Sequence, residues 1–203
     1  MLPLYTRFLT TSDYGKLDII QTTISLLIPL ITLQAVEAVF RYSIDMKERG
    51  NVSTVLVNGL LLCFVGMIVS LLLYPVFKKF EPFSSYVGFF YAIMFLSMTD
   101  SIMKQFVRGL GKTTVFVVSD LAYTVSVVSF NILFLIVVRL GLQGYFLSMV
   151  LAHLVSIVVL LAFGNVVENL GFRSFDRSFL KSMLIYSVPL IPNALMWWVM
   201  NVS

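Results

Sequence analysis

The chain has 203 residues, of which 59% are hydrophobic and only 12% are charged. A soluble domain carries about 25% charged residues, so this composition excludes a protein that stays in solution alone. The net charge of +4 comes from basic residues that are scattered between apolar stretches. Scattered charges of this kind are typical of membrane topology signals, so we expect no nucleic-acid partner.

Six stretches of the chain contain no Asp, Glu, Lys or Arg: 19–36, 50–77, 82–99, 121–138, 140–167 and 182–203. A helix needs about 20 mostly apolar residues to cross a bilayer, whereas the strands of a membrane barrel are short and alternate in polarity. The stretches therefore predict an all-α, polytopic transmembrane helical bundle. We place its helices at 17–40, 53–77, 86–107, 114–138, 143–165 and 182–203.

The first predicted span, 17–40, follows an apolar segment, 1–9, that is too short to cross a membrane. Glu37 and Arg41 lie four residues apart near the end of this span, and therefore on one helix face. One interpretation is a local ion pair at the membrane interface. The other is that Arg41 faces an inner cavity and meets an anionic group.

The third span, 86–107, continues into a polar stripe formed by Ser97, Asp100, Ser101, Lys104 and Arg108. At helical spacing these side chains fall within about 100° of arc. Charged groups are costly inside a bilayer, so we expect the stripe to face protein or water. The alternative is packing between helices, with Lys104 and Arg108 extending to the interface.

The fourth and fifth spans each contain polar residues. Asp120 and Asn131 are eleven residues apart, which returns them to nearly the same helical angle. Asp120 either faces a transport path or lies at the interface near the start of its helix. His153 is the only histidine and lies in an apolar helix, which favours a packed or hydrogen-bonded side chain over a catalytic one.

The last stretch contains two prolines, Pro189 and Pro192. Each removes a backbone donor and clashes with the preceding turn, so we expect a kinked or broken helix. Such breaks mark moving or binding elements in transporters, which makes the two prolines hinge candidates. A kink that only serves packing is the alternative.

Positive charge differs between the two sets of alternate loops. One set holds Arg41, Lys47, Arg49, Lys104, Arg108, Lys112, Arg173, Arg177 and Lys181, and the other holds Arg7, Lys16, Lys78, Lys79 and Arg139. The positive-inside rule places the richer set in the cytoplasm. The longest connection, 166–181, is then cytoplasmic.

Six short motifs, in their order and spacing, resemble bacterial Wzx-type polysaccharide flippases of the multidrug/oligosaccharidyl-lipid/polysaccharide exporter superfamily. They are Pro3-Leu4-Tyr5-Thr6-Arg7, Asp13-Tyr14-Gly15, Ala38-Val39-Phe40-Arg41-Tyr42, Arg108-Gly109-Leu110-Gly111-Lys112, Leu140-Gly141-Leu142-Gln143-Gly144 and Tyr186-Ser187-Val188-Pro189-Leu190-Ile191-Pro192. The resemblance implies two six-helix lobes around a central cavity with alternating access. It divides this chain into an N-terminal lobe with an incomplete first helix, 1–165, an interlobe connection, 166–181, and the start of a second lobe, 182–203. We therefore expect a fragment of a longer transporter.

The resemblance also implies movement of an undecaprenyl-diphosphate-linked oligosaccharide across the bacterial cytoplasmic membrane. Because a diphosphate is anionic, the candidate substrate-binding residues are Arg41, Lys104, Arg108, Arg7 and Asn131. Glu37, Asp100 and Asp120 would hold the cations in the empty state, or couple transport to H⁺ or Na⁺. We expect no cofactor beyond such an ion. Expected partners are the lipid-linked oligosaccharide, membrane lipids and other membrane proteins of polysaccharide assembly.

Three alternatives stay open at this point. A multidrug or cation exporter of the same superfamily would favour acidic over basic cavity residues. A membrane-embedded glycan polymerase would need a large outer loop or a catalytic cluster, and the sequence offers neither. A fragment without transport activity of its own is the third.

Overall fold

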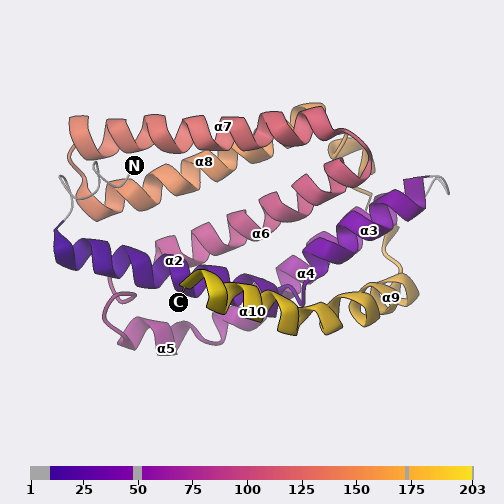
Figure 1. Cartoon of the computed structure of the whole chain (residues 1–203), viewed down its shortest axis with the longest axis horizontal. Helices are drawn as coiled ribbons and strands as arrows, with labels where there is room; N and C mark the ends of the chain where they lie inside the picture. Colours follow the sequence, from indigo (N-terminus) through magenta and orange to yellow (C-terminus); the bar gives the residue numbers. More distant parts are fainter. Residues whose placement is uncertain (1–9, 48–51, 172–173, 203) are drawn as a thin grey trace.

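The computed structural model describes residues 10–47, 52–171 and 174–202. Over these residues the chain is helical and contains no strand, which confirms the all-α prediction. The main helices are α2 (Thr11–Ile31), α3 (Ala35–Lys47), α4 (Val52–Leu71), α5 (Tyr74–Lys79), α6 (Val87–Gly109), α7 (Thr113–Asn131), α8 (Gly141–Phe163), α9 (Arg177–Ser187) and α10 (Ile191–Val202) (Figure 1). Shorter pieces are the π-helical η1 (Ile132–Val137) and the 3₁₀ turns η2 (Val167–Asn169) and η4 (Val188–Leu190).

Within the described residues, four helical segments are long and apolar enough to cross a membrane: Val52–Leu71, Thr113–Val137, Gly141–Phe163 and Arg177–Val202. The α2–α3 pair makes a fifth if it counts as one bent span. The helix α6 has 23 residues but is not among them, because its polar stripe lowers its hydropathy. The sequence predicts six spans. Four are these segments, a fifth is the bent α2–α3 pair, and the remaining one, predicted at 86–107, corresponds to α6. The chain is a multi-pass membrane protein.

Two of the predicted helices are broken. The helix predicted at 17–40 ends at Ile31 and restarts at Ala35, with a bend of 51°. Leu33 and Gln34 have φ angles of 49° and 57°, a left-handed conformation that cannot continue a right-handed helix. The helix predicted at 53–77 likewise divides into α4 and α5. The first break contains no charged residue and the second contains only Leu72 and Leu73, so neither interrupts the uncharged stretches.

The break predicted at the two prolines of the last stretch is a 3₁₀ turn within one helical segment, Arg177–Val202, and does not interrupt the span. The helix α9 ends at Ser187, the 3₁₀ turn η4 contains Pro189, and α10 contains Pro192 in its first turn. The helix α9 begins at Arg177, five residues before the predicted start of the last span. Asp176 caps it by accepting hydrogen bonds from the backbone N–H groups of Ser178 and Phe179.

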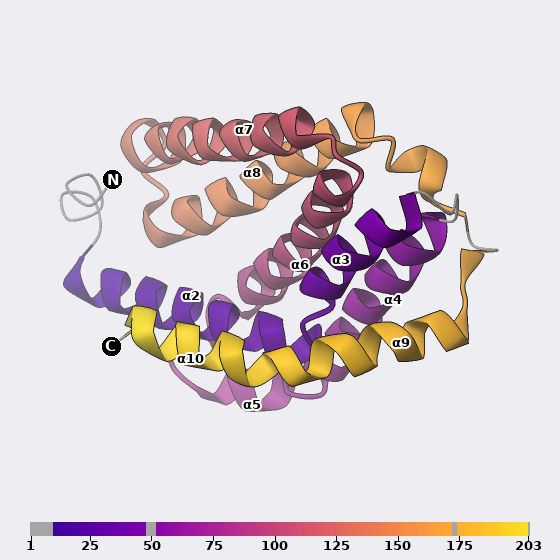
Figure 2. The same ribbon diagram turned by 45° about the vertical axis from the view of Figure 1, so that its right-hand side comes forward.

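The helix α6 is the centre of the bundle. It contacts α2, α3 and α4 on one side and α7 and α8 on the other, and Figure 1 shows it between these two groups. Its core face repeats every fourth residue with the fully buried Phe90, Met94, Met98, Ile102 and Phe106. In Figure 2, α9 and α10 run along the outside of the bundle, where they pack on α3 and α2 respectively.

Close helix packing fixes the bend between α2 and α3. A Cβ atom on Gly66 of α4 would lie 2.5 Å from the backbone oxygen of Ile31. Only glycine allows the two backbones to approach this closely. The end of α2 therefore rests directly on the backbone of α4.

Candidate charged cavity

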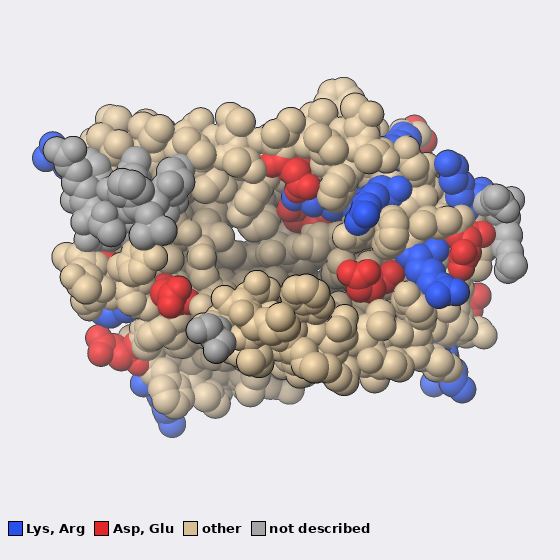
Figure 3. Space-filling view, viewed as in Figure 1, with Lys and Arg blue, Asp and Glu red and all other residues tan. Residues whose placement is uncertain are grey.

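A cavity of about 300 Å³ lies between α2, α6, α7 and α8. The polar side chains that line it are Gln21 and Ser25 on α2, Ser97, Asp100, Ser101 and Lys104 on α6, Tyr123 on α7 and His153 on α8. Figure 3 shows the face hollowed in its middle, with acidic and basic side chains beside the hollow. Four of the five residues of the predicted α6 stripe thus face this space.

Lys104 is held by two carboxylates from different helices. Its Nζ atom lies 2.8 Å from Oδ2 of Asp100, one turn earlier on α6, and 2.8 Å from Oδ1 of Asp120 on α7. Its ammonium also lies 5.2 Å from the ring centre of Tyr123. The lysine side chain is only 12% exposed. The ion pairs therefore join α6 to α7 at the wall of the cavity.

The two carboxylates differ sharply in their surroundings. The Asp100 side chain is 3% exposed, while that of Asp120 is 47% exposed. Asp100 also accepts a hydrogen bond of 2.7 Å from the Ser156 hydroxyl, and its other oxygen lies 3.3 Å from Nδ1 of His153. Asp100 is thus fixed by α8 as well as by Lys104.

His153 joins this cluster from α8. Its ring centre lies 4.6 Å from that of Tyr123 of α7, with the two rings tilted by 42°, and the side chain is almost fully buried. The prediction that it is packed and hydrogen-bonded is confirmed. Sequence reasoning missed that its partner is Asp100 and that it borders the cavity. The only indication of this in the sequence was a second polar residue, Ser156, one helical turn after His153 on the same face of the helix.

Two of the three candidate arginines, Arg41 and Arg108, lie outside the cavity. Arg41 is exposed, with Nε 3.9 Å from Oδ2 of Asp45 and its guanidinium 4.9 Å from the ring centre of Tyr186. Its carboxylate partner is Asp45 and not Glu37, so the predicted local ion pair with Glu37 is wrong. Arg108 is exposed as well.

The Arg108 guanidinium lies 4.6 Å from the ring centre of Phe40 and 5.7 Å from that of Phe116. Neither arginine is among the described residues that line the cavity. Contact with an aromatic ring still leaves guanidinium N–H donors for an anion.

The remaining candidates are dispersed. Asn131 is fully buried at the end of α7 and does not line the cavity. Glu37 is exposed on α3. Arg7 lies outside the described residues. Over the described part of the chain, no group of three or more His, Cys, Asp or Glu side chains is placed to hold a metal ion.

Loops of the positively charged set meet at one end of the bundle. Lys112 donates a hydrogen bond to Oδ1 of Asn165 in the α8–α9 connection. The Lys47 ammonium lies beside Gly111 in the α6–α7 turn. These contacts bring the end of α3, the α6–α7 turn and the start of the α8–α9 connection together, which agrees with their placement on the same side of the membrane.

A family model described as polysaccharide biosynthesis protein matches residues 1–203. The chain belongs to this family. The match is consistent with the N-terminal half of a Wzx-type polysaccharide flippase, as the sequence motifs indicate. Members of the family are generally transporters or flippases rather than enzymes, which supports a broad role in polysaccharide export. Neither the comparison with curated proteins nor that with solved structures gave a match.

Proposed function

We propose that the chain forms one lobe of a flippase that moves a lipid-diphosphate-linked oligosaccharide across the bacterial cytoplasmic membrane by alternating access. The family match supports polysaccharide export in general. The charged cavity is the observation that supports the finer proposal, because a diphosphate needs a cationic partner in a largely apolar wall. Lys104 of α6 lies at that wall and pairs with Asp120 of α7.

Lys104 is the capture residue in this proposal. A lysine ammonium is a compact charge with three donors, and two of its directions are already taken by Asp100 and Asp120. The diphosphate would replace the more exposed carboxylate. Arg41 and Arg108, both exposed, would meet the diphosphate before it reaches the cavity.

The cluster favours H⁺ over Na⁺ as the coupling ion. Na⁺ is held by oxygen ligands, and the Lys104 ammonium already occupies the space between the two carboxylates of the cluster. A proton needs only one basic atom. His153 offers such an atom beside Asp100, in a cluster whose formal charge is −1 when the histidine is neutral.

A rival proposal is export of cationic drugs, which would use acidic residues of the cavity. Asp100 and Asp120 share the Lys104 ammonium, so only a single net negative charge is left, and it attracts a second cation less than two unpaired carboxylates would. We therefore favour the anionic cargo.

The test is a flipping assay on the full-length transporter in vesicles, with a fluorescent lipid-diphosphate sugar on one leaflet. Lys104→Gln removes the charge and should lower the rate at least about tenfold, since a charge-assisted hydrogen bond contributes about 1.5–3 kcal/mol. Lys79→Gln, on the exposed part of α5, is the matched control and should leave the rate unchanged. Normal flipping by the Lys104 variant at equal expression would refute the assignment.

A further inference from the structure

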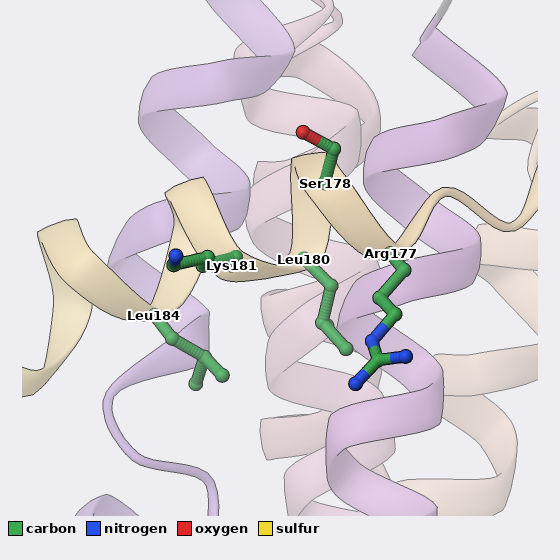
Figure 4. Close-up of a pocket in the computed structure, with 5 residues that line it drawn as sticks. All are labelled: Arg177, Ser178, Leu180, Lys181 and Leu184. Atoms are coloured by element: carbon green, nitrogen blue, oxygen red, sulfur yellow. The ribbon is translucent and has the colours of Figure 1, made fainter.

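A second pocket, separate from the charged cavity, lies on α9 at the start of the last candidate span. It has a volume of about 600 Å³ and is lined by Arg177, Ser178, Leu180, Lys181 and Leu184. In Figure 4, Leu180, Leu184 and the guanidinium of Arg177 point to the same side of α9. The pocket therefore combines cationic and aliphatic side chains.

The opposite face of α9 is already occupied by the bundle. The ring of Phe179 packs edge-on against Tyr42 of α3 at 5.1 Å, and Ser182 accepts a hydrogen bond from the Tyr42 hydroxyl through its backbone oxygen. Met183 is fully buried. These contacts fix the orientation of α9, and Leu180 and Leu184 of the pocket face also pack in part against the core.

The charges of the pocket have no acidic partner on the helix. Among the described residues, neither Arg177 nor Lys181 forms an ion pair. Asp176, the nearest carboxylate in the chain, caps α9 by accepting from two backbone N–H groups. Both cations are exposed, so the pocket attracts an anion.

The order of the side chains along α9 matches the polarity of a phospholipid. Arg177 comes first, Leu180 and Lys181 lie about one turn later, and Leu184 follows another turn further into the candidate span that begins at Arg177. From Arg177 to Leu184 the rise is about 10 Å, enough to pass from the headgroup region into the outer hydrocarbon. A soluble anion would use the charges but not the leucines.

We propose that this pocket binds an anionic phospholipid of the cytoplasmic leaflet, with its phosphate at Arg177 and Lys181 and an acyl chain against Leu180 and Leu184. The site lies directly before the 3₁₀ turn that separates α9 from α10. A bound lipid thus holds the helix that leads into this turn.

The test compares lipid immobilisation in vesicles that contain the purified chain. The probe is spin-labelled phosphatidylglycerol, with spin-labelled phosphatidylcholine as the neutral reference. The unmodified chain should immobilise phosphatidylglycerol preferentially. The double variant R177Q/K181Q should lose this preference. Each of the two substitutions should lower the preference for phosphatidylglycerol about fivefold, since each basic residue near an anionic surface contributes about that factor.

The matched control is K78Q/K79Q, which removes two exposed lysines from α5. It should retain the preference, and an equal loss in this variant would overturn the proposal in favour of a general charge effect. Addition of inorganic phosphate should not displace the lipid. Full displacement at millimolar phosphate would also overturn the proposal, because it would identify a simple anion site.

Discussion

Asp120→Asn should strengthen the binding of a diphosphate in the charged cavity. The substitution keeps the size of the side chain and removes the exposed one of the two carboxylates on Lys104. Asp100 stays in place, because Ser156 and His153 also hold it. The lysine then has a direction free for an anionic ligand, which no longer competes with a resident carboxylate.

The expected size of the effect follows from exposure. Two unit charges at 2.8 Å attract each other by about 6 kcal/mol at an effective dielectric constant of about 20. The Asp120 side chain is 47% exposed, so water screens the pair, and its net contribution is about 1 kcal/mol or less. Removing this competitor should lower the dissociation constant up to about fivefold.

Titration calorimetry of the purified chain in detergent with farnesyl diphosphate measures this change. Glu81→Gln is the matched control, because Glu81 is 87% exposed and pairs with Lys16 outside the cavity. The dissociation constant of farnesyl diphosphate for this control variant should equal that for the unmodified chain. Equal or weaker binding by the Asp120 variant would refute the reasoning that Asp120 and the diphosphate compete for Lys104.

Three further substitutions test the packing around the cavity, each by thermal or denaturant unfolding in detergent. Asp100→Asn should cost about 3 kcal/mol of unfolding free energy, because it breaks a buried ion pair; a loss as small as that of the Asp120 variant would contradict this. Trp198→Phe should cost about 1 kcal/mol, since the indole N–H donates to α2, whereas Trp197→Phe should cost less because that ring is 59% exposed. Gly66→Ala should lower the unfolding free energy by about 1–3 kcal/mol, because the new methyl group would overpack against α2. Gly88→Ala should be neutral, because there is open space around Gly88. Equal effects of the two substitutions would contradict the packing at the α2–α3 bend.

Properties that belong to a single helix were predictable from the sequence. The polar stripe of α6 follows from helical spacing alone, and its residues from Ser97 to Lys104 face one cavity. The distortion at Pro189 was predictable because proline removes a specific backbone hydrogen bond.

Properties that depend on two helices were not predictable. Asp120 was named from the sequence among the carboxylates that would hold the cations, but its pairing with Lys104 depends on how far α6 and α7 rotate about their axes, which a periodic pattern leaves undetermined. The same holds for His153 and Asp100, which are 53 residues apart. The α2–α3 bend was missed because hydropathy reports side chains, whereas the bend lies in the backbone at Leu33 and Gln34.

The bend also places two helix ends in the middle of an apolar segment. Helix ends leave N–H and C=O groups without helical partners, and hydrocarbon cannot hydrate them. Some are satisfied locally, since the N–H of Gln34 bonds to Pro29 and the Thr32 hydroxyl to Ile28. Gly66 lets α4 lie over the carbonyl of Ile31. The α4 backbone thus covers this polar corner, and a side chain larger than glycine at position 66 would push α4 away and uncover the Ile31 carbonyl.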